Sequence, residues 1–301
     1  MIKNKLFNEN DSLNSYLYNF NLTLNKENLD KFANIKYVLM QGSQFRAELL
    51  AQKLAYKLLG VDPIFFKPIN LINSSKFVIY RIKNVLSVSH GMGNTSLLTL
   101  LHNLSKVLYL AGNRDLEYIR IGTSGGIGIK PGSVVLTKEA YMPTLIPGYK
   151  ISALGKDIIY PTIMNTQLNL RIIAAQPENA TYNILIGNSI AADDFYLSQV
   201  RFDGAIKPNY THDDKQKYFD KLKTMDILNI EMESTGLAAF CNRANIPVAM
   251  VAAVLVNRMK SDQITATTDE LVRYAEHAQE VVLNYITSKD SGQSIASNIP
   301  R

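Results

Sequence analysis

The sequence has a single cysteine, Cys241, among its 301 residues. A disulfide within the chain is therefore impossible, and such sparse use of cysteine is typical of a reducing compartment. The N-terminal residues contain no sustained apolar segment of the kind found in signal peptides, and the longest apolar runs, such as 249–256, are far too short to span a bilayer. We therefore expect a cytoplasmic protein without a membrane partner.

Clustered positive charge is also lacking. The 32 lysines and arginines outnumber the 26 acidic residues and give a net charge of +6. These cations are scattered among acids, as in residues 212–217, and no basic stripe with interleaved aromatics is present. Nucleic acid is therefore not expected as a partner. The excess charge suits a small anionic substrate, although a solvated surface alone would also explain it.

The fingerprints of common cofactor and metal sites are missing too. No GxxxxGK[ST] pattern occurs, and the pair Gly91 and Gly93 lacks both a third spaced glycine and a later ribose-binding acid. Neither a P-loop nor a dinucleotide site is therefore predicted. The four histidines share no metal-ligand spacing with one another or with Cys241, so no metal is expected.

What the sequence does contain is an alternation of β-rich and helical patterns, which predicts an α/β fold. The adjoining runs 77–82 and 84–89 predict a hairpin and hence a mixed sheet. Residues 1–15 are predicted to form a polar arm and residues 290–301 a flexible tail, with a single domain over 16–289. The other β-rich runs are 36–41, 117–123, 133–137, 183–192 and 247–256, and the helical patterns are 43–59, 93–111, 213–224, 233–244 and 268–287.

Three polar, glycine-bearing turns follow apolar runs, at residues 42–46, 90–96 and 120–128. Backbone N–H groups in such turns, together with a fixed arginine, suit an oxyanion such as phosphate. Ligands of open α/β sheets collect where glycine-rich turns leave the carboxyl ends of strands. The helical pattern over 47–55 follows the first turn, so an anion could also face a helix N-terminus beside Arg46.

Two further segments suggest recognition of a base and a sugar. Phe195, Gln199 and Arg201 supply a ring, an amide and a cation, the set that a planar base with carbonyl and N–H groups requires. In isolation, a surface loop around a buried aromatic fits these residues better. Glu231 and Glu233 share one face of an extended segment and could accept hydrogen bonds from sugar hydroxyls. Acids at this position could instead complement the start of a helix.

A serine hydrolase is a competing hypothesis. Ser124 stands in a G-x-S-x-G pattern, and Asp203 or Asp226 followed by His277 would complete a triad in hydrolase order. That pattern must turn from a strand into a helix. Here it leads into the β-rich run 133–137, which argues against a hydrolase.

Taken together, these segments resemble the nucleoside phosphorylase superfamily, most closely its animal-type uridine phosphorylases, from about Tyr18 to the final helix. The most specific matches are residues 89–93, 120–128, 195–205 and 229–234. The resemblance implies a three-layer αβα fold with a central mixed, partly barrel-like sheet. It implies a pentosyltransferase of pyrimidine salvage that reversibly converts uridine and phosphate to uracil and ribose 1-phosphate. It also implies a homodimer with shared active sites and no cofactor, inorganic phosphate being a co-substrate.

The resemblance assigns site residues by position. Phosphate would be held by Gly42, Arg46, Arg120, Thr123 and Lys76, uracil by Phe195, Gln199, Arg201, Ser124 and Gly125, and ribose by Met232, Glu233, Glu231 and Asn19. Arg201, Gln199 and Arg120 would be the catalytic residues. The first two would stabilise charge on the departing uracil and the third would clamp the attacking phosphate.

Several positions depart from the patterns of related enzymes. Asn19 stands where the family sends a histidine from a neighbouring subunit to the ribose, and Lys76 where it sends an arginine to phosphate. These changes make a diverged, non-catalytic nucleoside-binding homologue an alternative. Asn257 replaces the aspartate of purine-cleaving relatives and favours pyrimidines, because an amide does not readily supply a proton. Phe77 replaces the glutamate of the bacterial potassium site, so that ion is not expected.

Overall fold

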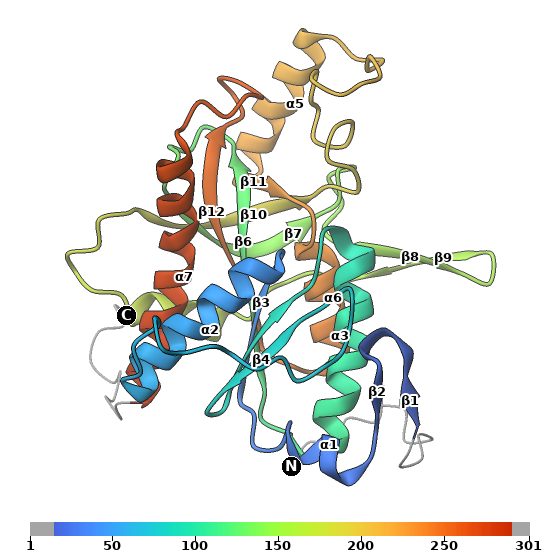
Figure 1. The fold of residues 1–301 in the computed structure, drawn as a ribbon. Helices are drawn as coiled ribbons and strands as arrows, with labels where there is room; N and C mark the ends of the chain where they lie inside the picture. The colour runs from blue at the N-terminus through green and yellow to red at the C-terminus, as the bar shows by residue number, and fades with distance from the viewer. Residues whose placement is uncertain (1–14, 291–301) are drawn as a thin grey trace. The chain divides into compact units, whose positions relative to one another are not determined.

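The computed structural model describes residues 15–290 (Figure 1). The chain divides into two compact units. The N-terminal unit consists of the residues up to Arg120 with Phe240–Val248, and the barrel unit of Ile121–Ala239 with the residues from Ala249 on. Apart from Ser15 and Asp290, the arm expected over 1–15 and the tail expected over 290–301 lie outside the described residues. The single domain expected over 16–289 stays a prediction.

The N-terminal unit is built on a mixed sheet. Strands β3 (Tyr37–Gln41) and β5 (Val85–Ser89) are parallel, β4 (Ile79–Ile82) pairs antiparallel with β5, and β6 (Glu117–Gly126) lies on the other side of β3. The tight turn between β4 and β5 passes through Lys83 at a φ of 52°, which confirms the predicted hairpin. Because β3 and β5 are parallel and in register, their carboxyl ends lie side by side.

Each of these parallel strands leads into a helix of the N-terminal unit. Helix α2 (Gln44–Leu59) follows β3, and α3 (Gly93–Leu110) follows β5. In α2 the buried residues recur at the spacing of one helix face, which packs against β4 and β5. These residues are Ala47, Leu50, Ala51, Leu54 and Ala55. The shorter elements before β3 are β1 (Tyr16–Leu17), η1 (Tyr18–Phe20), β2 (Leu22–Thr23) and α1 (Lys26–Asp30).

The barrel unit contains a closed barrel of five strands. Going round from β6, the order is β12 (Val248–Asn257), β7 (Val134–Tyr141), β10 (Ile184–Ala191) and β11 (Ile227–Glu231), and β11 pairs with β6 to close it. Strand β10 is parallel to both of its neighbours, β7 and β11. Strands β12 and β7 are antiparallel to each other. The expected mixed, partly barrel-like sheet is therefore confirmed. Strand β12 is apolar throughout most of its length because both of its faces are buried.

Helices and one hairpin surround this barrel. Helix α5 (His212–Thr224) packs Phe219 and Leu222 into an apolar cluster with β10 and β11. Helix α4 (Thr166–Ala174) contacts α7 (Thr268–Asp290), and α6 (Ser234–Ala244) follows β11. The hairpin of β8 (Tyr149–Ala153) and β9 (Lys156–Tyr160) extends away from the barrel (Figure 1). Among the described residues, every helix is too short or too polar to cross a bilayer.

Candidate active site

Two arginines of the N-terminal unit form a candidate anion site. Arg46 lies in the first turn of α2, directly after β3, and Arg120 lies on β6. Burial, together with the positive charge of Arg120, lowers the pKa of Arg46. Two like charges that approach each other at a partly buried place repel, and a bound dianion would relieve that repulsion. The structure thus brings together the two arginines that were predicted to hold phosphate.

A neutral histidine orients one of these arginines. His90 is fully buried, and its Nε2 accepts a hydrogen bond of 3.1 Å from Nε of Arg120. Burial lowers the pKa of His90 well below its usual value, and the charges of Arg120 and Arg46 act in the same direction. The imidazole therefore stays uncharged at neutral pH and offers a lone pair to the guanidinium. The sequence marked His90 only as part of a glycine turn and missed this contact.

The two glycine turns of the N-terminal unit lie next to each other at the ends of β3 and β5. The His90 N–H donates to the Gln41 carbonyl at 2.8 Å, and a Cβ on Gly42 would lie 3.4 Å from the Gly91 oxygen. Gly91 has a φ of +76°, and a Cβ there would come within 2.5 Å of the Ser96 hydroxyl. Both turns lead directly into helix N-termini, whose N–H groups favour an anion.

The buried, neutral state of His90 predicts a pH-dependent stability. The folded protein holds the pKa of His90 below 6.5, the ordinary value that the unfolded chain retains. Its contribution is therefore complete above that value and is lost as the pH falls below it, by at most about 1.4 kcal/mol per pH unit. His90→Gln keeps an acceptor for Arg120 but does not titrate. Urea unfolding at several pH values should show a shallower acid-side decline in this variant. An unchanged decline would contradict the neutral assignment.

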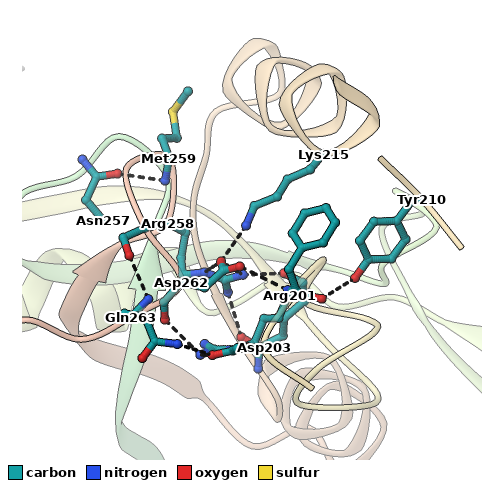
Figure 2. A network of polar contacts seen from close by, with 12 residues as sticks. Arg201, Asp203, Tyr210, Lys215, Asn257, Arg258, Met259, Asp262 and Gln263 are labelled. Atoms are coloured by element: carbon teal, nitrogen blue, oxygen red, sulfur yellow. Dashed lines mark hydrogen bonds and ion pairs between the residues drawn. The ribbon is translucent and has the colours of Figure 1, made fainter. Parts of the chain in front are cut away.

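In the barrel unit, the loop after β10 brings the predicted base-binding residues together. Nε and NH2 of Arg201 donate to the two carboxylate oxygens of Asp203 at 2.8 and 2.6 Å (Figure 2). The hydrogen bond with Asp203 raises the pKa of Arg201 and lowers that of Asp203. The Arg201 guanidinium also lies 4.8 Å from the centre of the Phe195 ring. A cation and a flat ring are therefore placed against each other, as base recognition requires.

Gln199 is held by an arginine that the sequence analysis missed. Arg258 is buried and follows β12; its NH1 donates to Oε1 of Gln199 at 3.2 Å and its NH2 to the Gln199 backbone oxygen at 2.7 Å. A guanidinium can only donate, so Oε1 of Gln199 must face Arg258. Arg258 could have been noticed because it directly follows Asn257, the residue that the family pattern had already marked.

Gly125 and Ser124, neighbours on β6, face opposite ways. A Cβ on Gly125 would lie only 2.6 Å from Cγ of Arg258, so a glycine is needed for the arginine side chain to pass. The Ser124 hydroxyl instead accepts from Nδ2 of Asn229 at 2.9 Å and donates to the Ala253 backbone oxygen at 3.3 Å. Gly125 thus borders the cluster around Gln199, whereas the Ser124 side chain bonds to groups of β11 and β12.

The triad that a serine hydrolase would need is not brought together. Ser124 has the partners just described, whereas Nδ1 of His277 lies 2.7 Å from the Gly132 carbonyl oxygen. Asp203 forms its ion pair with Arg201. Each of these residues thus has a different partner from the one that the triad requires, and the geometry does not favour the hydrolase.

The two glutamates near the end of β11 have different environments. The Glu231 carboxylate accepts from the N–H of Glu233 at 2.9 Å and from the N–H and hydroxyl of Ser234. It therefore caps the start of α6, the structural role that had been weighed for this acid. Glu233 is buried and Met232 half-buried in the same turn. The ribose contacts predicted for Glu231, Met232 and Glu233 stay predictions.

Asn19 and Lys76, predicted to act on a neighbouring subunit's site, line one surface pocket of the N-terminal unit. The pocket has a volume of about 450 Å³. Its wall is tied together by the Ser74 hydroxyl, which donates to the Asn19 backbone oxygen at 2.7 Å. Phe77, the next residue, is buried against Phe20 with ring centres 6.1 Å apart. The remaining predicted phosphate ligand, Thr123, is half-buried on β6.

Other chemistries find little support within residues 15–290. In that part of the chain, no group of three or more histidine, cysteine, aspartate or glutamate side chains could hold a metal ion. Cys241 is buried, and burial raises the pKa of its thiol. Such a thiol is unreactive at neutral pH.

Comparison with known proteins points to one family. A family model described as phosphorylase superfamily matches residues 36–287. Uridine phosphorylase 1 of Mus musculus is 36% identical over 272 residues, which cover 90% of this chain and 87% of the mouse protein. A uridine phosphorylase structure from Schistosoma mansoni in complex with uracil superposes with a TM-score of 0.84 at 32% identity, covering 92% of this chain and 95% of the other. A structure from the oomycete Phytophthora capsici, with uridine phosphorylases as its subject, gives 0.86 at 33% identity, covering 93% and 95%.

Proposed function

Since the chain belongs to the phosphorylase superfamily, and within it to the uridine phosphorylases, we propose that it catalyses the reversible phosphorolysis of uridine to uracil and ribose 1-phosphate. The observation that carries the proposal is the contact of Arg258 with Gln199. It fixes the orientation of a glutamine amide two residues before Arg201, and an amide and a cation suit a base with adjacent carbonyl and N–H groups. Asn257, which stands where purine-cleaving relatives have an aspartate, has a structural contact here. Its side-chain oxygen accepts from the Met259 N–H at 3.1 Å and so stabilises a turn.

The residue types of the barrel unit fit the departure of a pyrimidine. A phosphate oxygen forms the new bond to C1′ of the ribose while the bond from C1′ to N1 of the base breaks. The electron pair of the broken bond moves onto the base. Negative charge then spreads over the uracil carbonyls. Donors such as Arg201 and Gln199 stabilise that charge more in the transition state than in bound uridine, which is the condition for catalysis. Glu233 and Met232 would hold the ribose during the attack.

The residue types of the N-terminal unit fit the other substrate. Arg46 and Arg120 would bind phosphate with the glycine turn at Gly42. The contribution of Thr123, a residue of the barrel unit, stays a prediction. Phosphate is then both the nucleophile and a negative charge close to the developing cation on the sugar. Such positioning can supply a large part of the rate enhancement without a metal or an organic cofactor. Inorganic phosphate is thus a co-substrate.

The same proposal extends to assembly and location. We infer a cytoplasmic homodimer in which residues 16–289 form one domain. The common pocket of Asn19 and Lys76 supports shared sites, because both residues would reach a neighbouring molecule from the same surface.

The decisive test is the release of uracil from uridine with and without phosphate. Release should require phosphate or arsenate, since Ser124, the candidate nucleophile for hydrolysis, has no base among its described partners. Equal rates in phosphate-free buffer would exclude phosphorolysis. Binding of uridine without any uracil release would point to a non-catalytic homologue.

Lys76→Arg should lower the phosphate KM if Lys76 reaches a neighbouring site. Arginine restores a bidentate contact to phosphate, with two parallel hydrogen bonds, and differs little from lysine in size. Lys76 is exposed, so the substitution should leave the melting temperature unchanged. Phosphate KM is measured at saturating uridine in both proteins. An unchanged KM would place Lys76 outside the phosphate site.

A further inference from the structure

Asp262 lies in the turn after β12 and contacts three segments of the barrel unit (Figure 2). Its Oδ1 accepts from Nε and NH2 of Arg258 at 3.1 and 2.9 Å, and from Nζ of Lys215 on α5 at 2.6 Å. Its Oδ2 accepts from the Phe202 N–H at 3.2 Å, and its backbone oxygen from NH2 of Arg201 at 2.9 Å. One residue therefore links the loop after β10, helix α5 and the turn after β12.

The charge of Asp262 is what permits an arginine to be buried here. The Arg258 side chain is 0% exposed, and burial lowers its pKa. A buried guanidinium without a counter-ion is strongly destabilising. Burial alone would raise the pKa of Asp262, but the hydrogen bond from Lys215 and the charge of Arg258 outweigh it and lower the pKa. Asp262 is therefore ionised at neutral pH and neutralises Arg258.

The contact with Asp262 also decides which way Arg258 faces Gln199. The edge of the planar guanidinium that carries Nε and NH2 is turned to Asp262. NH1 is then directed at Oε1 of Gln199, while NH2 reaches the Gln199 backbone oxygen as well. Because both nitrogens only donate, the amide of Gln199 can have only one orientation, with its oxygen toward Arg258.

The segment around Arg201 depends on the same turn. Asp262 accepts from the Phe202 N–H with its carboxylate and from Arg201 with its backbone oxygen. The next residue, Gln263, donates from Nε2 to Oδ2 of Asp203 at 3.0 Å, and Asp203 holds the Arg201 guanidinium. The turn therefore holds Arg201 in two ways: directly through the Asp262 backbone oxygen, and indirectly through the contact of Gln263 with Asp203.

From these contacts we propose that Asp262 is a positioning residue for base recognition, acting on Gln199 through Arg258 and on the Arg201 segment directly. This inference rests on the proposed function and deepens it. The ligand class is a neutral pyrimidine with a carbonyl beside an N–H, which Gln199 reads only in the fixed orientation. Asp262 is not proposed to contact the base itself, because its described contacts are all with other residues of the protein.

The test is Asp262→Asn, which keeps the shape of the side chain and removes its charge. The uridine KM and the uracil dissociation constant measured by calorimetry should both rise about 10-fold to 100-fold, as when a residue that orients a metal ligand is removed. Phosphate KM should stay nearly unchanged, because Asp262 contacts Arg258, Lys215 and the Arg201–Phe202 segment, and none of these residues is predicted to hold phosphate. A variant that folds less well but has unchanged uridine KM and uracil affinity would show a purely structural role and overturn the proposal.

Two further variants sharpen the result. Lys215→Met removes the other cation on Asp262 but leaves the contact of Asp262 with Arg258, so uridine KM should not change. An increase as large as that of Asp262→Asn would mean that Asp262 merely anchors α5, and would overturn the proposal. Asp214→Asn is the control for loss of a bonded carboxylate: Asp214 accepts from the Thr211 N–H at 2.9 Å at the start of α5. It should lower stability slightly without changing KM.

The wild-type measurements separate the two levels of inference. Wild-type protein that binds uracil but releases none from uridine in phosphate would contradict the proposed function alone, and the uracil dissociation constants would still test Asp262. Wild-type protein that binds no uracil would overturn both proposals.

Discussion

Arg120→Met is expected to lower kcat/KM for phosphate by about 10²–10³-fold, the loss typical of removing one preorganised charged donor. Arg120 is 4% exposed on β6, and His90 already fixes its Nε at 3.1 Å. Methionine fills a similar volume and supplies neither charge nor donors, so the core should stay packed while the clamp is lost. The measurement is the rate of uracil release against phosphate concentration at saturating uridine.

The control for this variant is an arginine of the same unit whose described hydrogen bonds go only to backbone carbonyl oxygens. Arg81 on β4 donates to the Lys83 and Lys31 carbonyl oxygens at 2.9 and 2.7 Å. Arg81→Met should change the melting temperature slightly and phosphate kinetics not at all. If Arg120→Met lowered the melting temperature steeply while the remaining folded protein kept its phosphate KM, Arg120 would be structural and the anion site would lie elsewhere.

Elements with strong local signals could be predicted from the sequence. The hairpin of β4 and β5 and the helices α2, α3, α5, α6 and α7 match the predicted ranges to within a few residues because their apolar spacing and turn residues are local. Strand β11 was not predicted, although Glu231 had been placed in an extended segment and residues 229–234 had been matched to the family. Its pairing with β6 closes the barrel over a long sequence separation, which no local pattern encodes. The hairpin of β8 and β9 was also missed, because its strands are mostly exposed and show no clean alternation.

The site divides in the same way between local and tertiary signals. Glycine turns with Arg46 and Arg120 could be recognised because their composition alone suits an anion. His90 and Arg258 act by contacting another side chain across the fold, so their roles could not be predicted before the contact was known. Glu231 had two possible roles in the sequence, and only the hydrogen bonds to the start of α6 distinguish them.

Arg201→Ala should lower kcat for uridine by about 10²–10³-fold, or roughly 3–4 kcal/mol of transition-state stabilisation. The uracil carbonyls carry their negative charge mainly in the transition state, so kcat should fall by more than the uridine KM rises. Asp203 loses its ion pair in this variant but keeps the hydrogen bond from Gln263, and its side chain is 25% exposed, so water can solvate it. The fold should therefore tolerate the change.

Arg201→Lys is the matched variant for this prediction, because it keeps the charge and loses the planar fork that spans both oxygens of Asp203. An intermediate kcat is expected if both charge and geometry matter. The measurement is the separate determination of kcat and KM for uridine at saturating phosphate in the two variants. If alanine raised KM while kcat stayed unchanged, Arg201 would bind uridine and its transition state equally. Charge stabilisation of the leaving base would then have to come from Gln199 and from Arg258, which fixes its amide.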